Sequence, residues 1–253
     1  MFLERLSILI DSLLGFGYYL RMAKIVLGVC AHPDDLEFGC GGSIAKWVSE
    51  GATAYFLVLT DGSKGSEDPN ITPEELKVIR RSEQEEAAKI LGVKENFFLD
   101  YIDGELENNL ELRKKIVRVI RQIKPDVVIT MDPSFLYDAK MGFINHPDHR
   151  ACGQATLDAI FPFARNAKTF PELLEEGLFS HNVKEVLLVN FQNMNYFVDI
   201  TDEMETKLEA ILAHKSQVDN PEEIQGFMRK AGKMLGKKIN VEYAEGFVKI
   251  NPN

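Results

Sequence analysis

Short apolar runs that alternate with helix-like segments are the feature that most restricts the fold of this chain. The first run, 24–30, is rich in Ile and Val and short enough to be a strand buried on both faces. Similar runs lie at 53–60, 126–130 and 185–189, with a shorter one at 96–99. This alternation predicts an α/β fold with a mostly parallel sheet and helices on both faces.

Proline and capping residues mark the helices between these runs. Pro73 stands at the first helical position, with Thr72 as N-cap and Glu75 three residues later, and Gly92 is expected to end this helix. Residues 62–72 are polar and predict a loop near the site. Further helices are expected at 43–48 after a glycine cluster, at 110–123, at 147–161, from a cap at Thr201-Asp202 to Ala213, and from Pro221, before a possible strand near Val241.

The first 22 residues predict a helical extension of a single domain that spans residues 1–253. Five apolar side chains recur there at helical spacing, and the apolar stretch 8–20 is too short to cross a bilayer. We expect this helix to pack on the domain or on another subunit, so a homo-oligomer is predicted. A membrane-surface anchor is the lesser alternative, because few basic residues accompany the stretch. The five residues are Leu3, Leu6, Ile10, Leu13 and Leu14.

Net charge and cysteine content limit the partners and the compartment. The chain carries 39 acidic and 29 basic side chains, a formal net charge of −10. A nucleic acid or an anionic membrane would require a basic face, so neither is an expected partner. Cys30, Cys40 and Cys152 are an odd number without CxxC spacing, which indicates a reducing, cytoplasmic location.

Two clusters of His and Asp lie where predicted strands are followed by polar loops. The first is 31–35 (Ala-His-Pro-Asp-Asp), directly after the first strand, and the second is 145–150 (Asn-His-Pro-Asp-His-Arg). Open α/β sheets bind ligands at the carboxyl ends of their strands.

Pro147 suits the first helical position and keeps His146 extended, so His146 and His149 approach from different directions. Side chains next to each other in an extended loop diverge, which separates Asp34 from Asp35 in the same way. Each cluster can therefore supply one metal ligand and one acid-base group.

Ligands of His, Asp and His type with one open position are typical of catalytic zinc. A carboxylate that does not bind the metal can take a proton from the metal's water. Taken singly, either cluster is more simply a capped turn or solvated surface, and it is their pairing at strand ends that favours a site. A dinucleotide fingerprint from Gly39, Gly41 and Gly42 with Asp61 fails on spacing.

These motifs together resemble the LmbE-like (PIG-L) metal-dependent deacetylases, in order from about residue 24 to about residue 217. The resemblance implies a Rossmann-like fold that binds zinc and removes the N-acetyl group from N-acetylglucosamine derivatives. It rests on 31–35, Gly41-Gly42, 60–62 and 145–150, with weaker support from 80–83, 87–88, 91–92 and 213–217.

The resemblance also implies a role for each site residue. His32, Asp35 and His149 match metal ligands, and Asp34 matches the general base that activates a metal-bound water. His146 matches the residue that stabilises the oxyanion or protonates the leaving amine, and Asp148 would orient it. Arg80 matches a substrate-contacting arginine, with a surface salt bridge as the alternative. His214 is expected to be a structural histidine.

Zinc is the expected cofactor, with another divalent metal such as Fe²⁺ possible, and a small amino sugar is the expected partner. Two other classes of protein stay open. A metal-storage protein has no use for a spare carboxylate such as Asp34. A non-haem iron enzyme uses the same ligand types, but its motif usually sits on a β-barrel.

Overall fold

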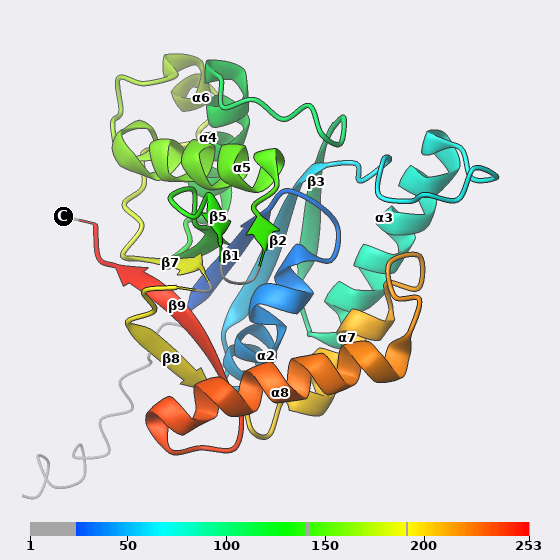
Figure 1. Cartoon of the computed structure of the whole chain (residues 1–253). Coiled ribbons are helices and arrows are strands. Elements are labelled where there is room, and N and C mark those ends of the chain that lie inside the picture. The colour runs from blue at the N-terminus through cyan, green and yellow to red at the C-terminus, as the bar shows by residue number, and fades with distance from the viewer. Residues whose placement is uncertain (1–23, 140–141, 191, 253) are drawn as a thin grey trace, which may run out of the picture.

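A seven-stranded sheet carries the site, in the order β3-β2-β1-β4-β7-β9-β8 (Figure 1). The computed structural model describes residues 24–139, 142–190 and 192–252. Strands β1, β2, β3, β4 and β7 are mutually parallel, whereas β9 runs antiparallel between β7 and β8. The predicted mostly parallel sheet is therefore confirmed. The strands are β1 (Ile25–Cys30), β2 (Thr53–Thr60), β3 (Glu95–Tyr101), β4 (Val127–Met131), β7 (Glu185–Val189), β8 (Tyr196–Asp199) and β9 (Ala244–Ile250).

Helices cover both faces of this sheet, as predicted. One apolar core lies between the sheet and α2, α3, α7 and α8, and the other lies under α4, α5, η1 and α6. Alternate residues of β1, such as Val26 and Leu27, belong to opposite cores, which explains why the strand sequence is apolar throughout. The helices are α2 (Asp35–Ser49), α3 (Pro73–Ile90), α4 (Leu110–Ile123), α5 (Pro147–Asp158), η1 (Ala159–Ala164), α6 (Pro171–Glu175), α7 (Met204–Leu212) and α8 (Pro221–Ile239).

The order of strands reverses between β1 and β4. From β1 the chain moves outward through β2 to β3, then returns to β4 on the other side of β1 and continues to β7. In open α/β sheets, the crevice at such a switch point is where ligands bind. The first His-Asp cluster follows β1, and the second, after β4, includes the first turn of α5, so the topology brings both to this crevice.

Helix α2 begins earlier than predicted. It starts at Asp35, so Gly39, Gly41 and Gly42 lie inside it and not in a loop before it. Close packing accounts for the glycines: a Cβ atom on Gly42 would lie 2.8 Å from the Ile200 side chain. The expectation that Asp34 and Asp35 sit in one extended loop is therefore wrong.

Several other boundaries differ from those expected. The Thr201 hydroxyl donates to Asp199 Oδ1 at 2.6 Å and does not cap a helix, and α7 starts only at Met204. Helix α5 ends at Asp158, and the chain continues through η1 with Phe161 extended (φ −136°, ψ 123°). The last strand, β9, starts at Ala244. The sequence did not indicate β8, α6 or the hairpin of β5 (Tyr137–Asp138) and β6 (Phe143–Ile144).

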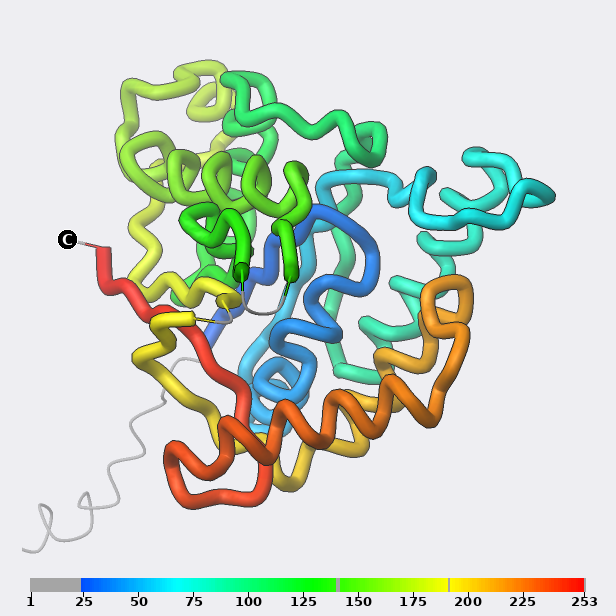
Figure 2. The backbone as a smooth tube through the Cα atoms, viewed as in Figure 1, coloured from blue at the N-terminus to red at the C-terminus, as the bar shows by residue number. Residues whose placement is uncertain are grey.

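Segment 62–72 contains neither helix nor strand, as expected, and it projects beside the start of α3 (Figure 2). The predicted helix over 1–22 lies outside the described residues, so the helix and the single domain that includes it stay predictions. In the part of the chain that is described, no helix is both long and apolar enough to cross a membrane.

Candidate active site

A sharp turn after β1 separates the two adjacent aspartates. Asp34 is the N-cap of α2 and has a left-handed backbone (φ 97°), whereas Asp35 is the first residue of the helix. Asp35 Oδ2 accepts a hydrogen bond from the His32 backbone N–H at 2.8 Å. Asp35 Oδ1 lies 3.1 Å from His149 Nε2. The two carboxylates therefore face different partners, as predicted, but for a different reason.

The hydrogen bonds of Asn145 determine which nitrogen of His149 is free. The Asn145 side-chain amide donates to the Phe135 carbonyl at 2.7 Å, so its Oδ1 is the atom 3.2 Å from His149 Nδ1. An amide oxygen can only accept, and Nδ1 therefore carries the proton. His149 Nε2 is left unprotonated in the neutral ring, as a metal ligand must be.

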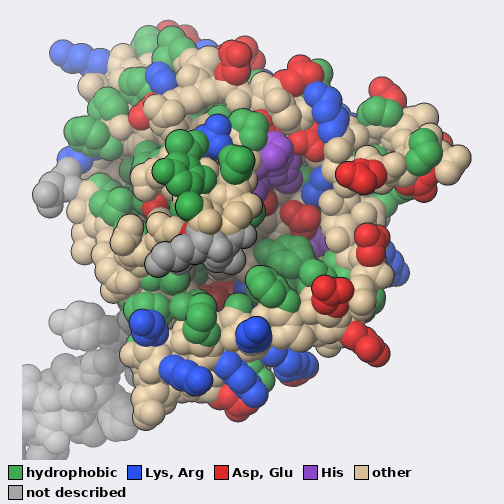
Figure 3. Space-filling model, in the orientation of Figure 1, with side chains coloured by type: hydrophobic (Ala, Val, Ile, Leu, Met, Phe, Trp, Pro, Cys, Tyr) green, Lys and Arg blue, Asp and Glu red, His purple; other side chains and the backbone are tan. Residues whose placement is uncertain are grey.

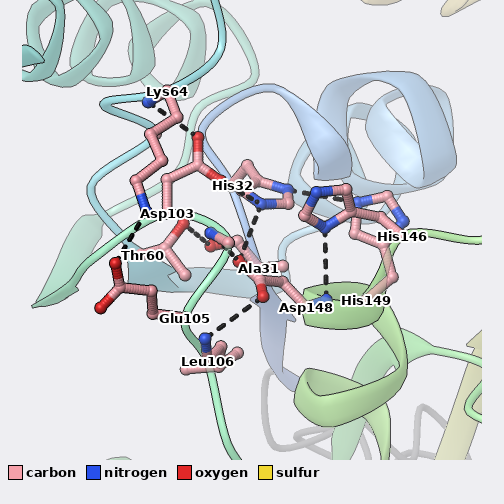
Figure 4. Close-up of polar contacts among 12 residues, drawn as sticks. Ala31, His32, Thr60, Lys64, Asp103, Glu105, Leu106, His146, Asp148 and His149 are labelled. Carbon is pink, nitrogen blue, oxygen red and sulfur yellow. Dashed lines mark hydrogen bonds and ion pairs between the residues drawn. The ribbon is translucent and has the colours of Figure 1, made fainter.

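Two carboxylates determine the orientation of His32 in the same way. Its Nε2 lies 3.1 Å from Asp103 Oδ1 and 3.3 Å from Asp148 Oδ2. Nε2 is therefore the protonated nitrogen, and Nδ1 faces His149 Nε2 at 3.2 Å (Figure 4). Carboxylates behind a ligating histidine fix its tautomer and make it more basic.

The atoms that remain form a group that could hold a metal ion. His32 Nδ1 and His149 Nε2 are 3.2 Å apart, and Asp35 oxygens lie 3.6 Å from the first and 3.1 Å from the second. In a tetrahedral zinc site with bonds of about 2.1 Å, neighbouring ligand atoms are roughly 3.4 Å apart. The three predicted ligands therefore fit a zinc ion and leave the fourth position open.

A second group of possible ligands shares His32. Its members are His32, Asp103 and His146. This group would need His32 Nε2 without its proton, although that nitrogen lies between two carboxylates. The group of His32, Asp35 and His149 is the better cradle because its free nitrogens need no such rearrangement.

The histidines and carboxylates of the site shift one another's pKa values in the metal-free protein. Burial disfavours a charged His32, but contacts with Asp103, Asp148 and Asp35 outweigh it and raise the pKa of His32 to about 12. Burial also opposes a charged His149, but Asp35 outweighs it and raises the pKa of His149. Burial opposes a charged Asp35, but both histidines outweigh it and lower the pKa of Asp35. A bound cation would take the place of these protons.

Asp34 lies beside the ligand group with a different environment. Its Oδ2 is 3.3 Å from an Arg80 guanidinium nitrogen. Burial, and then the negative charge of Asp35, raise the pKa of Asp34 to about 7, while Arg80 opposes this rise. A general base works best with a pKa near the operating pH.

His146 is placed by the first turn of α5. Its Nδ1 accepts a hydrogen bond from the Asp148 backbone N–H at 3.2 Å, so Nε2 carries the proton of the neutral ring. Burial, and then the neighbouring His32, lower the pKa of His146, which keeps the ring neutral at neutral pH. The ring centres of His146 and His32 are 4.7 Å apart. His146 can therefore donate a hydrogen bond into the same space.

The carboxylate of Asp148 has other partners than expected. We expected it to orient His146, but its oxygens accept from the backbone N–H groups of Gly104 (2.7 Å) and Leu106 (3.2 Å) and face His32. The hydrogen bond between Asp148 and His146 comes from the Asp148 backbone N–H. The carboxylate thus orients a predicted metal ligand.

Arg80 and His214 are both buried. Arg80 is 3% exposed, so the alternative of a surface salt bridge is wrong. Its guanidinium donates to the carbonyls of Pro33 (2.6 Å) and Gly62 (3.0 Å), and its predicted substrate contact stays a prediction. His214 is buried outside the ligand group, and neither ring nitrogen has a hydrogen bond within the described structure.

Sequence reasoning assigned no role to Asp103, Asn145, Gln84 or Glu37. Asp103 follows β3, and the rule that charged residues at strand ends mark a site would have found it. The strand was expected to end at 99, however, and β3 continues to Tyr101. Gln84 and Glu37 act through hydrogen bonds between distant segments, which no local pattern signals. Asn145 belongs to the second cluster, and its contact with His149, four residues later, is local.

The site opens to solvent on one face of the molecule. Histidine side chains lie in a hollow of the face shown in Figure 3, with acidic side chains close by. The His149 side chain is 24% exposed. A small substrate can therefore reach the ligand group from this side.

Comparison with known proteins agrees with this arrangement. The family model PIG-L, described as GlcNAc-PI de-N-acetylase, matches residues 27–160. The diacetylchitobiose deacetylase of Thermococcus kodakarensis is 38% identical over 227 residues, covering 88% of this chain and 82% of that protein. A probable N-acetyl-alpha-D-glucosaminyl L-malate deacetylase 2 of Bacillus anthracis is 29% identical, covering 78% and 83%.

A solved structure shares the whole fold. The N,N'-diacetylchitobiose deacetylase from Pyrococcus horikoshii, in complex with the inhibitor MPG, superposes with a TM-score of 0.84 at 36% identity, covering 99% of this chain and 93% of that one. The predicted family and α/β fold are confirmed, and so is the prediction of a deacetylase enzyme. The chain belongs to the PIG-L (LmbE-like) family of deacetylases.

Proposed function

We propose that this protein is a zinc-dependent hydrolase that removes the N-acetyl group from an N-acetylglucosamine-containing sugar. The observation that carries the proposal is the convergence of His32 Nδ1, Asp35 and His149 Nε2 at tetrahedral spacing, with Asp34 left outside the group. A storage site has no need of the spare carboxylate. Hydrolysis needs it, because water must lose a proton as it attacks an amide.

Each residue of the site has a separate role in the proposed amide hydrolysis. His32, Asp35 and His149 would hold a divalent metal, which would act as a Lewis acid and make a water at the site easier to deprotonate. Asp34 accepts the proton of the attacking water. The Nε2–H of His146 donates a hydrogen bond to the carbonyl oxygen as negative charge develops there. The amine then leaves with the proton that Asp34 received, and acetate is the second product.

The substrate proposal follows the relatives. Diacetylchitobiose is the first substrate to test, because relatives named for it are 38% and 36% identical to this chain. Free N-acetylglucosamine and its malate conjugate are the alternatives, the second supported by the more distant relative. A strongly anionic aglycone is less favoured by a chain with a net charge of −10. We propose a cytoplasmic location from the reduced cysteines, all three of which are buried and free.

Metal analysis combined with an acetate assay tests this function. Protein purified without added metal should contain close to one zinc per chain and should release acetate from one of these three sugars. Iron in place of zinc, without acetate release, would favour the non-haem iron alternative. Bound metal with no hydrolysis of any sugar would favour a storage protein.

The variant His149→Ala tests the ligand assignment. It removes one of three ligands, so metal content and acetate release should fall together. Arg118→Ala is a suitable control, because Arg118 is bonded to Glu176 on the surface, away from the site. Full metal occupancy in His149→Ala would show that the ligand assignment is wrong.

A further inference from the structure

Three buried polar side chains lie behind Asp34. They are Glu37 on α2, Gln84 on α3 and His214 just after α7, and each has no exposed surface. Buried polar groups destabilise a protein unless their hydrogen bonds are made, and a buried charge is more costly still. Three such side chains together in an apolar core therefore indicate a specific role.

Gln84 connects this cluster to Asp34. Its Oε1 accepts a hydrogen bond from the Asp34 backbone N–H at 2.9 Å, and its Nε2 donates to Glu37 Oε1 at 2.7 Å. An ionised carboxylate can only accept. Glu37 therefore fixes the orientation of the Gln84 amide, with the oxygen toward Asp34.

His214 faces the other oxygen of Glu37. The distance from His214 Nε2 to Glu37 Oε2 is 3.6 Å, and among the described residues neither atom has a hydrogen bond. The segment that carries His214 is attached to α3, because the Ser216 N–H and hydroxyl donate to Glu83 at 2.8 and 2.6 Å. Glu37 Oε2 therefore faces His214, while Glu37 Oε1 bonds to Gln84.

Asp34 has a backbone that needs support. A positive φ of 97° is unfavourable for a residue other than glycine and persists only where its surroundings enforce it. Two side chains of α3 enforce it here. Gln84 holds the Asp34 N–H, and Arg80 holds the preceding Pro33 carbonyl at 2.6 Å. The two contacts from α3 therefore hold the turn that carries Asp34.

We propose that Gln84, oriented by Glu37, is a positioning residue that holds the general base Asp34 in its left-handed conformation. The inference rests on the proposed function only in that Asp34 acts as the base. Gln84 does not touch the ligand group, so its loss should change turnover and not metal binding. Displacement of a catalytic group by about 1 Å can cost about 100-fold in rate.

Two single variants and one double variant test the proposal. Gln84→Met keeps the size but removes both hydrogen bonds, and kcat should fall by about 10- to 100-fold with KM and zinc content little changed. Gln84→Glu places two carboxylates at 2.7 Å from each other and should be impaired as well. In the double variant E37Q/Q84E, the amide and the carboxylate exchange places and both hydrogen bonds can form again, so kcat should recover.

Arg121→Met is the control for general destabilisation. Arg121 is buried on α4, on the opposite face of the sheet, where it donates to four backbone carbonyls. Its loss should lower Tm and leave kcat per folded molecule unchanged. An unchanged kcat in Gln84→Met, or a double variant no better than Gln84→Glu, would overturn the proposal.

A structural measurement separates this inference from the proposed function. If the wild-type protein releases no acetate, the function fails, and crystal structures of the wild type and Gln84→Met still test the positioning. Asp34 should leave the left-handed conformation in Gln84→Met and regain it in the double variant. An unmoved Asp34 in Gln84→Met would overturn the inference whatever the activity.

Discussion

The two nitrogens of His32 face opposite kinds of partner. Nε2 faces Asp103 and Asp148, whereas Nδ1 faces the other predicted ligands. Asn145 holds the proton of His149 on Nδ1 in an equivalent way. These contacts favour the tautomers that metal binding would need, and the atoms that make them come from the loop after β3, from α5 and from the loop before α5.

Replacing each of the adjacent aspartates with asparagine should affect zinc binding and turnover differently. Asp34→Asn keeps the size but removes the base, so it should retain zinc while turnover falls by roughly 10² to 10⁴. Asp35→Asn replaces an anionic ligand with a neutral one, so zinc affinity should fall first and activity with it. Zinc content and kcat of both variants, with and without excess zinc, provide the measurement.

Excess zinc distinguishes the two variants. It should restore part of the activity of Asp35→Asn and none of that of Asp34→Asn. Equal loss of zinc in both variants would mean that both carboxylates bind the metal. Little effect from either change would mean that neither aspartate belongs to a site.

Metal affinity should rise with pH across the neutral range. In the metal-free protein, carboxylates keep the pKa values of His32 and His149 above the ordinary value, against the effect of burial. Metal must displace a proton from each ligand nitrogen, so lower pH strengthens the competing proton and weakens binding. Affinity should increase by up to about tenfold per pH unit for each proton released.

Competition with a chelating dye at pH 6, 7 and 8 measures this dependence. Asp103→Asn removes one of the carboxylates that raise the pKa of His32, so its dependence on pH should be weaker. An affinity that stays constant over this range would contradict the prediction.

At the scale of elements, the local patterns predicted regular segments well. The bounds expected at 53–60, 110–123 and 185–189 are those of β2, α4 and β7. Strand β8 was missed because it is short and only partly buried, so it lacks a continuous apolar run. The start of α2 was missed because its glycines indicate a loop locally, whereas tight packing against Ile200 and Val189 requires them in the helix.

The two motifs located the site, but not the contacts that complete it. Asp103, Gln84 and Glu37 reach it from the loop after β3, from α3 and from α2, and only the folded chain brings these segments together. The role of the Asp148 carboxylate likewise depends on Gly104 and Leu106, more than forty residues earlier in the chain.

An ion pair between Lys207 of α7 and Glu245 of β9, which bonds to the backbone of α2, should be important for stability. Lys207 donates to the Phe38 carbonyl at 2.7 Å, and Glu245 accepts from the N–H groups of Gly42 (3.0 Å) and Ser43 (2.7 Å). In a regular helix, the Gly42 N–H would bond to Phe38. Lys207 and Glu245 are also paired and almost fully buried. Lys207→Met leaves the Glu245 charge without its partner and should lower the free energy of unfolding by about 3–5 kcal/mol.

Urea denaturation measures this effect. Lys184→Met is the matched control, because Lys184 pairs with Asp126 at 2.7 Å but its side chain is 73% exposed. Loss of an exposed pair should change the free energy of unfolding by about 0–1 kcal/mol. Equal effects of the two variants would show that the buried pair has no special part in α2.

At the scale of the whole molecule, the crossover between β1 and β4 determines where chemistry takes place. It brings residues from the carboxyl ends of β1, β3 and β4 to one crevice, although they are up to 117 positions apart in the chain. Since one fold can host several reactions, the deacetylase proposal depends on this site and on the family, and not on the sheet alone.

The chain of 253 residues should form a homo-oligomer at micromolar concentration. The apolar side chains at helical spacing in the first 22 residues exceed what one short helix needs for its own face, and an apolar face of that size requires a cover. Light scattering after size exclusion should therefore give a mass that is a multiple of 28.6 kDa.

The double variant Leu6→Lys/Ile10→Lys places charge on that face and should reduce the mass. Acetate release should persist in the variant, because the site residues lie between positions 32 and 149. A monomeric mass for the wild-type chain would contradict the prediction, and an oligomer unaffected by the two lysines would place the contact elsewhere on the molecule.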